Sequence, residues 1–557
     1  MSSLLFLVAL VPAAEPPVAA DLVVLNAKVW TGEPKQPEAE ALAALHGRII
    51  KVGTTAEVKP LVGAKTIVID AGGKRVVPGF HDSHLHFLGG GQQLARVELK
   101  DCKDEAEFGD RLKDFDRNTP RDRWMLGGNW DHDRTFGGKL PTAATLDKYV
   151  PNRPVFLRRY DGHMALANTL ALKKAGITAD TKDPPGGVIE RLPDGKTPSG
   201  ALKDNAISLL DKLIPEPDDA EIAEAVRAAM KACAENGVTS ATDMDGSAAV
   251  TRRKYVRVLQ RLAAKGDLTV RLSVHTPIAF NSDTTAAGIE ANFGNEFVRL
   301  GGVKGFMDGS LGSSTAKMFT GYDSDPKTTG VYVTQPELMK TYVKAADAGG
   351  LSVAIHAIGD QANAVLLDIF GEVAKANGPR DRRFRIEHAQ HLRPKDYKRF
   401  KLNGVVASMQ PYHVIDDGRW AEGRIGAKRC ASSYAYRGLL DAGAVLAFGS
   451  DWPVAPLDVL AGIDAALNRR PLDGKHPNGW FPEQRITVAE ALTAYTRGSA
   501  FASHQDDEKG TIAVGKFADF IILSRDIFAK AEQDKLADVK VDATVAGGKL
   551  VFERKTK

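Results

Sequence analysis

Two histidines, His84 and His86, stand two residues apart at the end of the stretch 78–86, which follows an apolar run. On an extended strand this spacing sends both imidazoles to the same face. Neutral imidazoles that converge from rigid backbone are good ligands for transition metals, zinc above all. A His-x-His pair alone is a weak signal, so its meaning depends on the partners that the rest of the chain supplies.

Short apolar strands alternate with helical segments through most of the chain, which indicates how such partners would be positioned. One expected strand precedes His81, and the others cover 238–242, 268–274, 303–307, 351–355, 384–386, 405–409 and 445–448. Continuous apolar strands that alternate with helices predict a parallel sheet covered by helices, and eight such units predict a (β/α)8 TIM barrel. A doubly wound open sheet would need dinucleotide-type glycines after its first strand, where this chain has histidines.

The two ends of the chain differ from its middle in their pattern of apolar and polar residues. Segments 21–77 and 507–557 alternate apolar and polar residues in short pieces, and we expect them to form one small, β-sandwich-like domain together. Two separate β tails would each leave sheet edges exposed. The barrel would then occupy 78–506, with an α/β insertion at about 89–217, after its first strand.

Catalytic groups of a TIM barrel lie at the carboxyl ends of its strands, so the residues that end each expected strand are the candidates. They are His84 and His86 on the first strand, Lys304 on the fourth, His356 on the fifth, His388 on the sixth and Asp451 on the eighth. The alternative is a chance placement of core histidines and a capping aspartate. Thirteen histidines are spread over the chain, and four of them fall at strand ends, which favours a metal site.

Composition restricts the class of ligand. The chain has 557 residues, 43% of them hydrophobic, and its 74 Lys and Arg nearly balance 70 Asp and Glu. A net charge of +4 makes no electrostatic case for nucleic acid or an anionic membrane surface, so we expect a small-molecule substrate. Three cysteines, Cys102, Cys233 and Cys430, lack the spacing of a zinc or redox motif.

The N-terminus contains a short apolar run at 4–11, followed by small residues of the kind that precede cleavage sites. We expect residues 1–20 to be a signal peptide of a periplasmic or secreted protein. The absence of Lys and Arg before the apolar run leaves an ordinary terminus of a cytoplasmic protein as the alternative. The run is too short to span a bilayer, and a homodimer is one assembly compatible with the sequence.

Taken together, these residues resemble the amidohydrolase superfamily of metal-dependent hydrolases, and more narrowly the branch that contains N-substituted formamide deformylase. The resemblance extends over nearly the whole chain, from Asp21 to Phe552. Besides 78–86, it rests on the motifs at 237–241, 303–312, 355–360, 386–388 and 448–453, and on the closing segment 510–519.

The resemblance implies two divalent metal ions. His84 and His86 would hold the more buried ion with Asp451, and His356 and His388 would hold the second. Lys304 would be carboxylated by CO2 and would bridge both ions as a carbamate. Imidazole and carboxylate ligands suit zinc best, with iron or manganese as alternatives. An unmodified Lys304 paired with Asp308 would instead leave a site for one metal.

The reaction implied is hydrolysis of an amide, formamide or cyclic amide, a carbon–nitrogen bond outside ordinary peptides. A metal-activated hydroxide would attack the carbonyl carbon, and Asp451 would take up the proton and deliver it to the departing nitrogen. Two alternatives stay open: a one-metal deaminase of a ring amine, and a non-catalytic binding protein on the same scaffold.

Residues that select the substrate are harder to identify from sequence, because they lie on loops. Trp130 is expected in the pocket wall, and His163 could donate a hydrogen bond to the substrate carbonyl or could serve as a helix cap or core residue. Asp308 and Gln361 are further candidates for substrate contact, and His413 could line the mouth of the site. We expect His391 on the solvated surface.

Overall fold

The computed structural model of the chain describes residues 19–159, 164–244 and 249–555, and these residues form two compact units. Of the described residues, the first unit comprises 19–85, 233–244 and 269–555, and the second comprises 86–159, 164–232 and 249–268. The expected signal peptide lies outside the described residues except for its last two positions, and His163 lies outside them as well.

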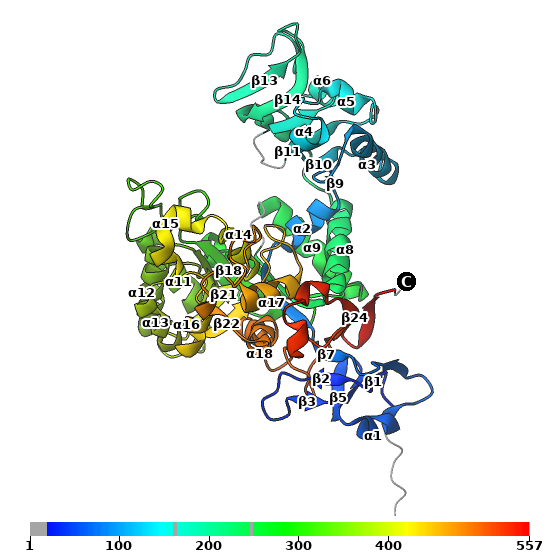
Figure 1. Cartoon of the computed structure of the whole chain (residues 1–557), viewed down its shortest axis with the longest axis vertical. Helices are drawn as coiled ribbons and strands as arrows, with labels where there is room; N and C mark the ends of the chain where they lie inside the picture. Colours follow the sequence, from blue (N-terminus) through cyan, green and yellow to red (C-terminus); the bar gives the residue numbers. More distant parts are fainter. Residues whose placement is uncertain (1–18, 160–163, 245–248, 556–557) are drawn as a thin grey trace, which may run out of the picture. The chain divides into compact units, whose positions relative to one another are not determined.

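The centre of the first unit is a parallel barrel sheet. Within the described residues, its eight strands follow the chain in the order β8 (Phe80–Leu85), β15 (Val238–Asp243), β16 (Arg271–Pro277), β18 (Val298–Phe306), β19 (Val353–Ala357), β20 (Arg385–His388), β21 (Val406–Met409) and β22 (Val445–Phe448). Helices α11 (Pro336–Ala348), α12 (Asp360–Asn377), α13 (Tyr397–Leu402) and α16 (Tyr436–Asp441) lie outside these strands (Figure 1). The predicted TIM barrel is therefore confirmed.

The first barrel strand differs from the prediction in its position. The apolar run at β7 (Arg75–Pro78) pairs with strands of the terminal β domain, and the barrel strand is β8, which begins only at Phe80. All six residues of β8 are buried, although it carries His81, Asp82, Ser83 and His84. A buried strand this polar is stable only if other strands supply hydrogen-bond partners, so the barrel interior must be polar at this point.

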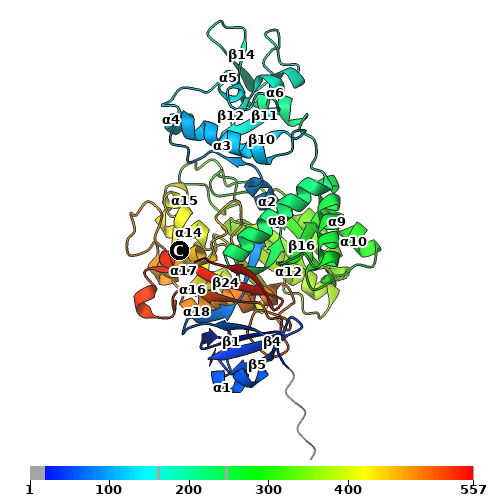
Figure 2. The same cartoon turned by 90° about the vertical axis from the view of Figure 1, so that its right-hand side faces the viewer.

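Both ends of the chain build the terminal β domain of the first unit. β7 pairs with β23 (Phe520–Leu523), which also pairs with β24 (Val541–Ala546). A second sheet contains β1 (Leu22–Leu25), β4 (Ala41–Leu45), β5 (Arg48–Gly53) and β6 (Ile67–Asp70). Leu22 and Val24 of this sheet share a hydrophobic core with Phe520 and Val545. Strands from the two ends of the chain therefore lie in the same part of the molecule, as β1 and β24 show in Figure 2.

The second unit contains a six-stranded mixed sheet of its own, with β9 (Val97–Glu98) at one edge and β13 (Gly187–Arg191) at the other. Between them lie β10 (Met125–Trp130), β11 (Val155–Arg159), β12 (Met164–Ala167) and β14 (Pro198–Asp204). Helix α3 (Glu105–Asn118) contributes Phe108 and Leu112 to the core on one side of this sheet.

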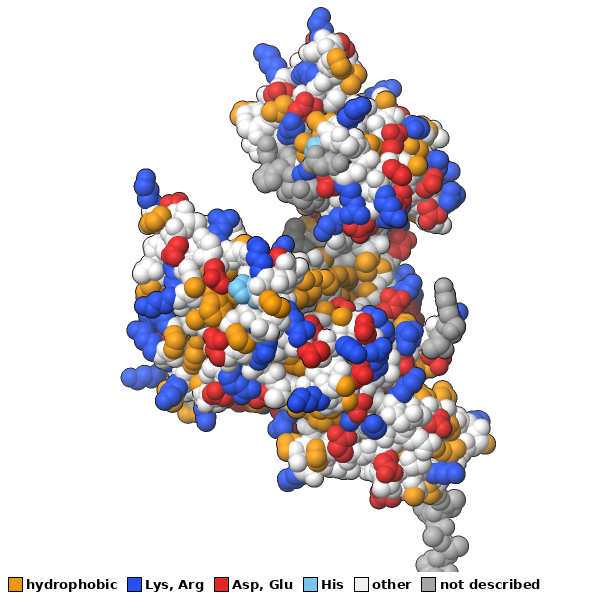
Figure 3. Space-filling model, in the orientation of Figure 1, with side chains coloured by type: hydrophobic (Ala, Val, Ile, Leu, Met, Phe, Trp, Pro, Cys, Tyr) orange, Lys and Arg blue, Asp and Glu red, His pale blue; other side chains and the backbone are white. Residues whose placement is uncertain are grey.

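The surface of both units carries charges of both signs, interspersed on the face shown in Figure 3. This pattern agrees with the near balance of acidic and basic residues in the sequence. Among the helices of the described residues, none is long and apolar enough to cross a membrane.

Candidate metal centre

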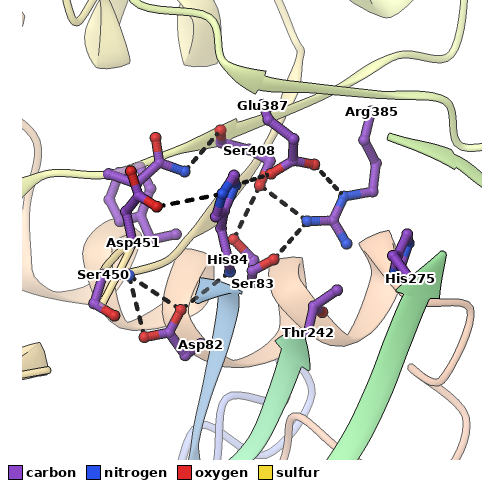
Figure 4. Close-up of polar contacts among 12 residues, drawn as sticks. Asp82, Ser83, His84, Thr242, His275, Arg385, Glu387, Ser408, Ser450 and Asp451 are labelled. Atoms are coloured by element: carbon purple, nitrogen blue, oxygen red, sulfur yellow. Dashed lines mark hydrogen bonds and ion pairs between the residues drawn. The ribbon is translucent and has the colours of Figure 1, made fainter. Parts of the chain in front are cut away.

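Two of the predicted ligands meet where the barrel closes on itself. His84 lies near the end of β8, and Asp451 follows β22, the strand at the other end of the sheet order. His84 Nε2 lies 3.4 Å from Asp451 Oδ1, and the side chains are 1% and 8% exposed (Figure 4). The closure of the barrel therefore brings together residues that are far apart in the chain.

His388 completes a cluster with these two residues. One ligand atom from each of His84, His388 and Asp451 lies within 4.8 Å of the others, and all three residues are buried. His388 and Asp451 adopt positive φ angles of 73° and 62°, a conformation that costs free energy for residues other than glycine. Strained backbone at buried polar residues is typical of functional sites.

The chemistry of this cluster fits a metal ion. His388 Nδ1 is buried and has no hydrogen-bond partner among the described residues. Burying an unpaired polar nitrogen costs free energy, and a metal ion bound to it would offset that cost. Burial, together with nearby Lys304, lowers the pKa of His84 to about 4, and burial also holds the pKa of His388 well below its usual value. Both imidazoles are thus neutral at pH 7, the form that binds metals.

His356 and Lys304 lie beside the cluster. The rings of His356 and His388 are 4.6 Å apart between centroids, and His356 Nε2 donates a hydrogen bond to the carbonyl oxygen of Gly309 over 3.1 Å. Burial lowers the pKa of Lys304 to about 8, which leaves roughly a tenth of the amine neutral at pH 7. Lys304 therefore has a much larger neutral fraction at pH 7 than an exposed lysine has.

His86 is the first residue of the second unit and immediately precedes helix α2 (Phe87–Leu94). It remains a predicted ligand.

Asp82 connects the first barrel strand to the segment that follows the last one. Its carboxylate is fully buried and accepts hydrogen bonds from the backbone amides of His84, at 3.0 Å, and of Ser450, at 3.0 and 3.1 Å (Figure 4). These bonds join the first strand to the segment after the last strand. The backbone that carries His84 and Asp451 is therefore organised by one aspartate, which sequence reasoning had left without a role.

Asp308 has a structural role that differs from the predicted substrate contact. Its carboxylate accepts hydrogen bonds from the backbone amides of Lys317, Ile358 and Gly359 at 2.8 to 3.0 Å, and it is 1% exposed. No ion pair with Lys304 is found among the described residues. Asp308 thus fixes the loops after β18 and β19, because both of its oxygens accept backbone amides.

The other predicted substrate contacts have different outcomes. The prediction that Trp130 lines a pocket is wrong. Trp130 is fully buried in the core of the second unit, where its Nε1 donates a hydrogen bond to the carbonyl oxygen of Leu157 over 2.9 Å. It is therefore part of a core and not of a pocket wall, because a large apolar ring gains most from complete burial. Gln361 is half-buried in the first turn of α12 and stays a candidate.

His413 faces the cluster from α14 (Tyr412–Asp417), the helix that follows β21. Its Nε2 lies 3.8 Å from Asp451 Oδ2, and its ring stacks on that of His388 at 6.2 Å between centroids and 10° between planes. This Nε2 is buried and forms no hydrogen bond within the described residues. In the sequence, His413 could be recognised only by its position just after the seventh strand. That position alone did not distinguish it from other histidines in loops.

The prediction that His391 lies on the solvated surface is also wrong, because this residue is only 2% exposed. Its Nδ1 lies 2.6 Å from Ser433 Oγ, and its Nε2 lies 3.1 Å from Gln390 Nε2. The histidine is a satisfied core residue.

Comparison with known proteins agrees with this geometry. The model of the amidohydrolase family matches residues 67–552. Protein LONG AFTER FAR-RED 3 of Arabidopsis thaliana is 40% identical, over 96% of this chain and 92% of its own length. N-substituted formamide deformylase of Arthrobacter pascens is 28% identical, over 96% of this chain and 98% of its own. The crystal structure of an uncharacterized metal-dependent hydrolase from Pyrococcus horikoshii OT3 is 29% identical, with a TM-score of 0.74, and covers 91% of this chain and 98% of that one.

Proposed function

Because the chain belongs to the amidohydrolase family, we propose that it is a metal-dependent hydrolase that cleaves a non-peptide carbon–nitrogen bond of a small molecule. The observation that carries this proposal is the buried convergence of His84, His388 and Asp451 at the carboxyl ends of three barrel strands. The relative named as an N-substituted formamide deformylase makes formamides and related amides the first substrates to test.

The residues that would hold the metal are His84, His388 and Asp451, with His86, His356 and Lys304 as further ligands of a two-ion site. We propose that Lys304 carries a CO2-derived carbamate in that state. A divalent ion, zinc in the first instance, supplies a Lewis acid and activates water at neutral pH.

Asp451 is the group that moves the proton. Its carboxylate belongs to the cluster and is nearly excluded from solvent, so it can accept a proton from the attacking water. A bond forms between the water oxygen and the carbonyl carbon, the carbon–nitrogen bond breaks, and Asp451 returns the proton to the departing nitrogen. His413, 3.8 Å from Asp451, is placed to donate a hydrogen bond to the substrate or to the carboxylate.

A one-metal deaminase is the second candidate. The specific observation in its favour is that the cluster within 4.8 Å contains three ligand residues among those described, which is the protein ligand count of a single catalytic zinc. Metal content separates the two candidates: two ions per chain support the binuclear hydrolase, and one ion with an unmodified Lys304 supports the deaminase.

The test begins with metal-stripped protein, to which zinc or manganese is returned. N-formyl, N-acyl and cyclic amides are screened for released amine, and ring amines are screened for released ammonia. Asp451→Asn should abolish turnover with metal still bound, whereas Asp473→Asn, the same change at an exposed aspartate, should not. A fully active Asp451→Asn protein would refute the mechanism, and a wild-type protein that binds metal yet hydrolyses nothing would favour the binding-protein alternative.

A further inference from the structure

We propose that Glu387 and Arg385 are positioning residues that set the tautomer, orientation and metal affinity of His84. The proposal rests on the proposed metal site, and it concerns two side chains that contact the ligand His84 and not the metal itself. Both residues belong to β20, which ends in the ligand His388. The two-residue period of a strand places positions 385 and 387 on the same face, toward the barrel interior.

Glu387 contacts the side of His84 that faces away from the cluster. Its Oε2 lies 2.7 Å from His84 Nδ1, and the glutamate is fully buried (Figure 4). An ionised carboxylate can only accept a hydrogen bond, so Nδ1 carries the hydrogen and Nε2 keeps its lone pair. That lone pair is the one on the side of Asp451, where a metal would bind.

Arg385 in turn holds Glu387. Its Nε donates to Glu387 Oε1 over 2.8 Å, and one terminal nitrogen donates to the carbonyl oxygen of Ser83, at 2.6 Å, and to Ser408 Oγ, at 3.0 Å. These partners lie on β8 and β21. The guanidinium therefore ties the strand of His84 to two others and prevents Glu387 from rotating away from the imidazole.

Stability alone does not account for this pair. Arg385 and Glu387 are both fully buried, and Arg385 Nη1 has no hydrogen-bond partner among the described residues. A buried ion pair with an unsatisfied donor is commonly no more stable than apolar side chains of similar volume. Residues that hydrogen-bond to metal-ligating histidines, by contrast, affect metal binding strongly, and their loss typically lowers metal affinity or activity about 10- to 100-fold. We expect a loss of metal affinity on the order of 10- to 100-fold here.

The experiment measures zinc affinity of the full-length, metal-stripped chain by competition with a chromophoric chelator, and the visible spectrum of the cobalt-substituted protein. Glu387→Gln should weaken zinc binding about 10- to 100-fold and change the cobalt spectrum. Arg385→Met should weaken it as well, and the double variant should bind no more weakly than Glu387→Gln alone, because Arg385 acts through Glu387. Arg385→Lys, which keeps a cation beside Glu387, should recover part of the affinity.

The matched control is the buried pair of Arg271 and Asp519, whose atoms approach to 2.7 Å with 4% and 5% exposure. Arg271 begins β16 and so lies at the opposite end of the barrel. Arg271→Met should lower thermal stability without changing zinc affinity or the cobalt spectrum.

Two results would overturn the inference: unchanged affinity and spectrum in Glu387→Gln, or a double variant in which the two losses add. If Glu387→Gln does not fold, the comparison of Arg385→Met with Arg385→Lys decides, and equal affinities in these two variants and the wild type would refute it. A wild-type chain that binds no metal would remove the proposed function as well, whereas an active, metal-binding wild type with unaffected variants would remove this inference alone.

Discussion

The backbone amide of Asp451 donates a hydrogen bond to the carbonyl oxygen of His84 over 2.7 Å. The carboxylate that we propose transfers the proton and an imidazole that we propose binds the metal are thus linked through their main chains as well as through their side chains. Any change that separates the first barrel strand from the segment after the last one should therefore disturb the metal centre.

Gly449→Ala should disturb this closure directly. A Cβ at this position would lie 2.5 Å from the backbone nitrogen of His84 and 2.7 Å from Asp82 Oδ1. We expect a loss of about 1–3 kcal/mol in stability from overpacking, and a lower zinc content after dialysis. Gly423→Ala is the control, because a Cβ there meets nothing within 4 Å. Equal zinc content in both variants would show that the close approach at Gly449 does not matter.

Asp82→Ala should be more damaging than Asp82→Asn. The alanine leaves the buried amides of His84 and Ser450 without their acceptor, which costs about 1–3 kcal/mol for each group. The asparagine keeps one carbonyl oxygen in place and should lose less. Thermal unfolding and zinc content of the two variants measure the difference, and the same loss in both would argue that charge, not hydrogen bonding, is what Asp82 contributes.

His413→Ala should separate metal binding from catalysis. His413 is not in the three-residue cluster, so we expect full metal content, but its Nε2 lies 3.8 Å from Asp451. On a substrate found in the screen, kcat/KM should fall by about 10²-fold or more, the range typical of positioned proton-transfer and hydrogen-bonding groups. His476→Ala, in a loop after α17 (Val459–Asn468), is the control. A variant that loses metal would instead make His413 a ligand.

Lys509→Met should change the pH dependence of stability. Burial, with Arg271 nearby, lowers the pKa of Lys509 to about 7, from 10.5 in the unfolded chain. Between these values the unfolded chain binds more protons, so the contribution of Lys509 to stability becomes more favourable as pH rises, by at most about 1.4 kcal/mol per pH unit. Below pH 7 both states are protonated and the penalty is complete.

The methionine variant should therefore be more stable than the wild type at pH 6–7, and this advantage should shrink as the pH approaches 10. Urea unfolding at several pH values measures it, and the exposed Lys540→Met serves as the control. An advantage that does not vary with pH would mean that Lys509 is not titrating in the folded state.

Much of the barrel was predictable because its signals are local. Apolar runs of strand length locate the seven barrel strands from β15 to β22, in the order in which the sheet pairs them. A strand end is also a local property, so His388 and Asp451 could be assigned to one end of a barrel without knowledge of any contact. The first strand was misplaced for the same reason: β7 is the more apolar segment, but the polar β8 is the barrel strand.

Sequence alone determined which residue types end the strands, and hence that a cluster of imidazoles and a carboxylate would form at one end of the barrel. Tertiary structure decided what each side chain contacts. Glu387 meets His84 across 303 positions of the chain, and Trp130 turns into a core instead of a pocket. Such pairings depend on strand register and on closure of the sheet, which many weak, non-local contacts determine together and no short stretch of sequence encodes.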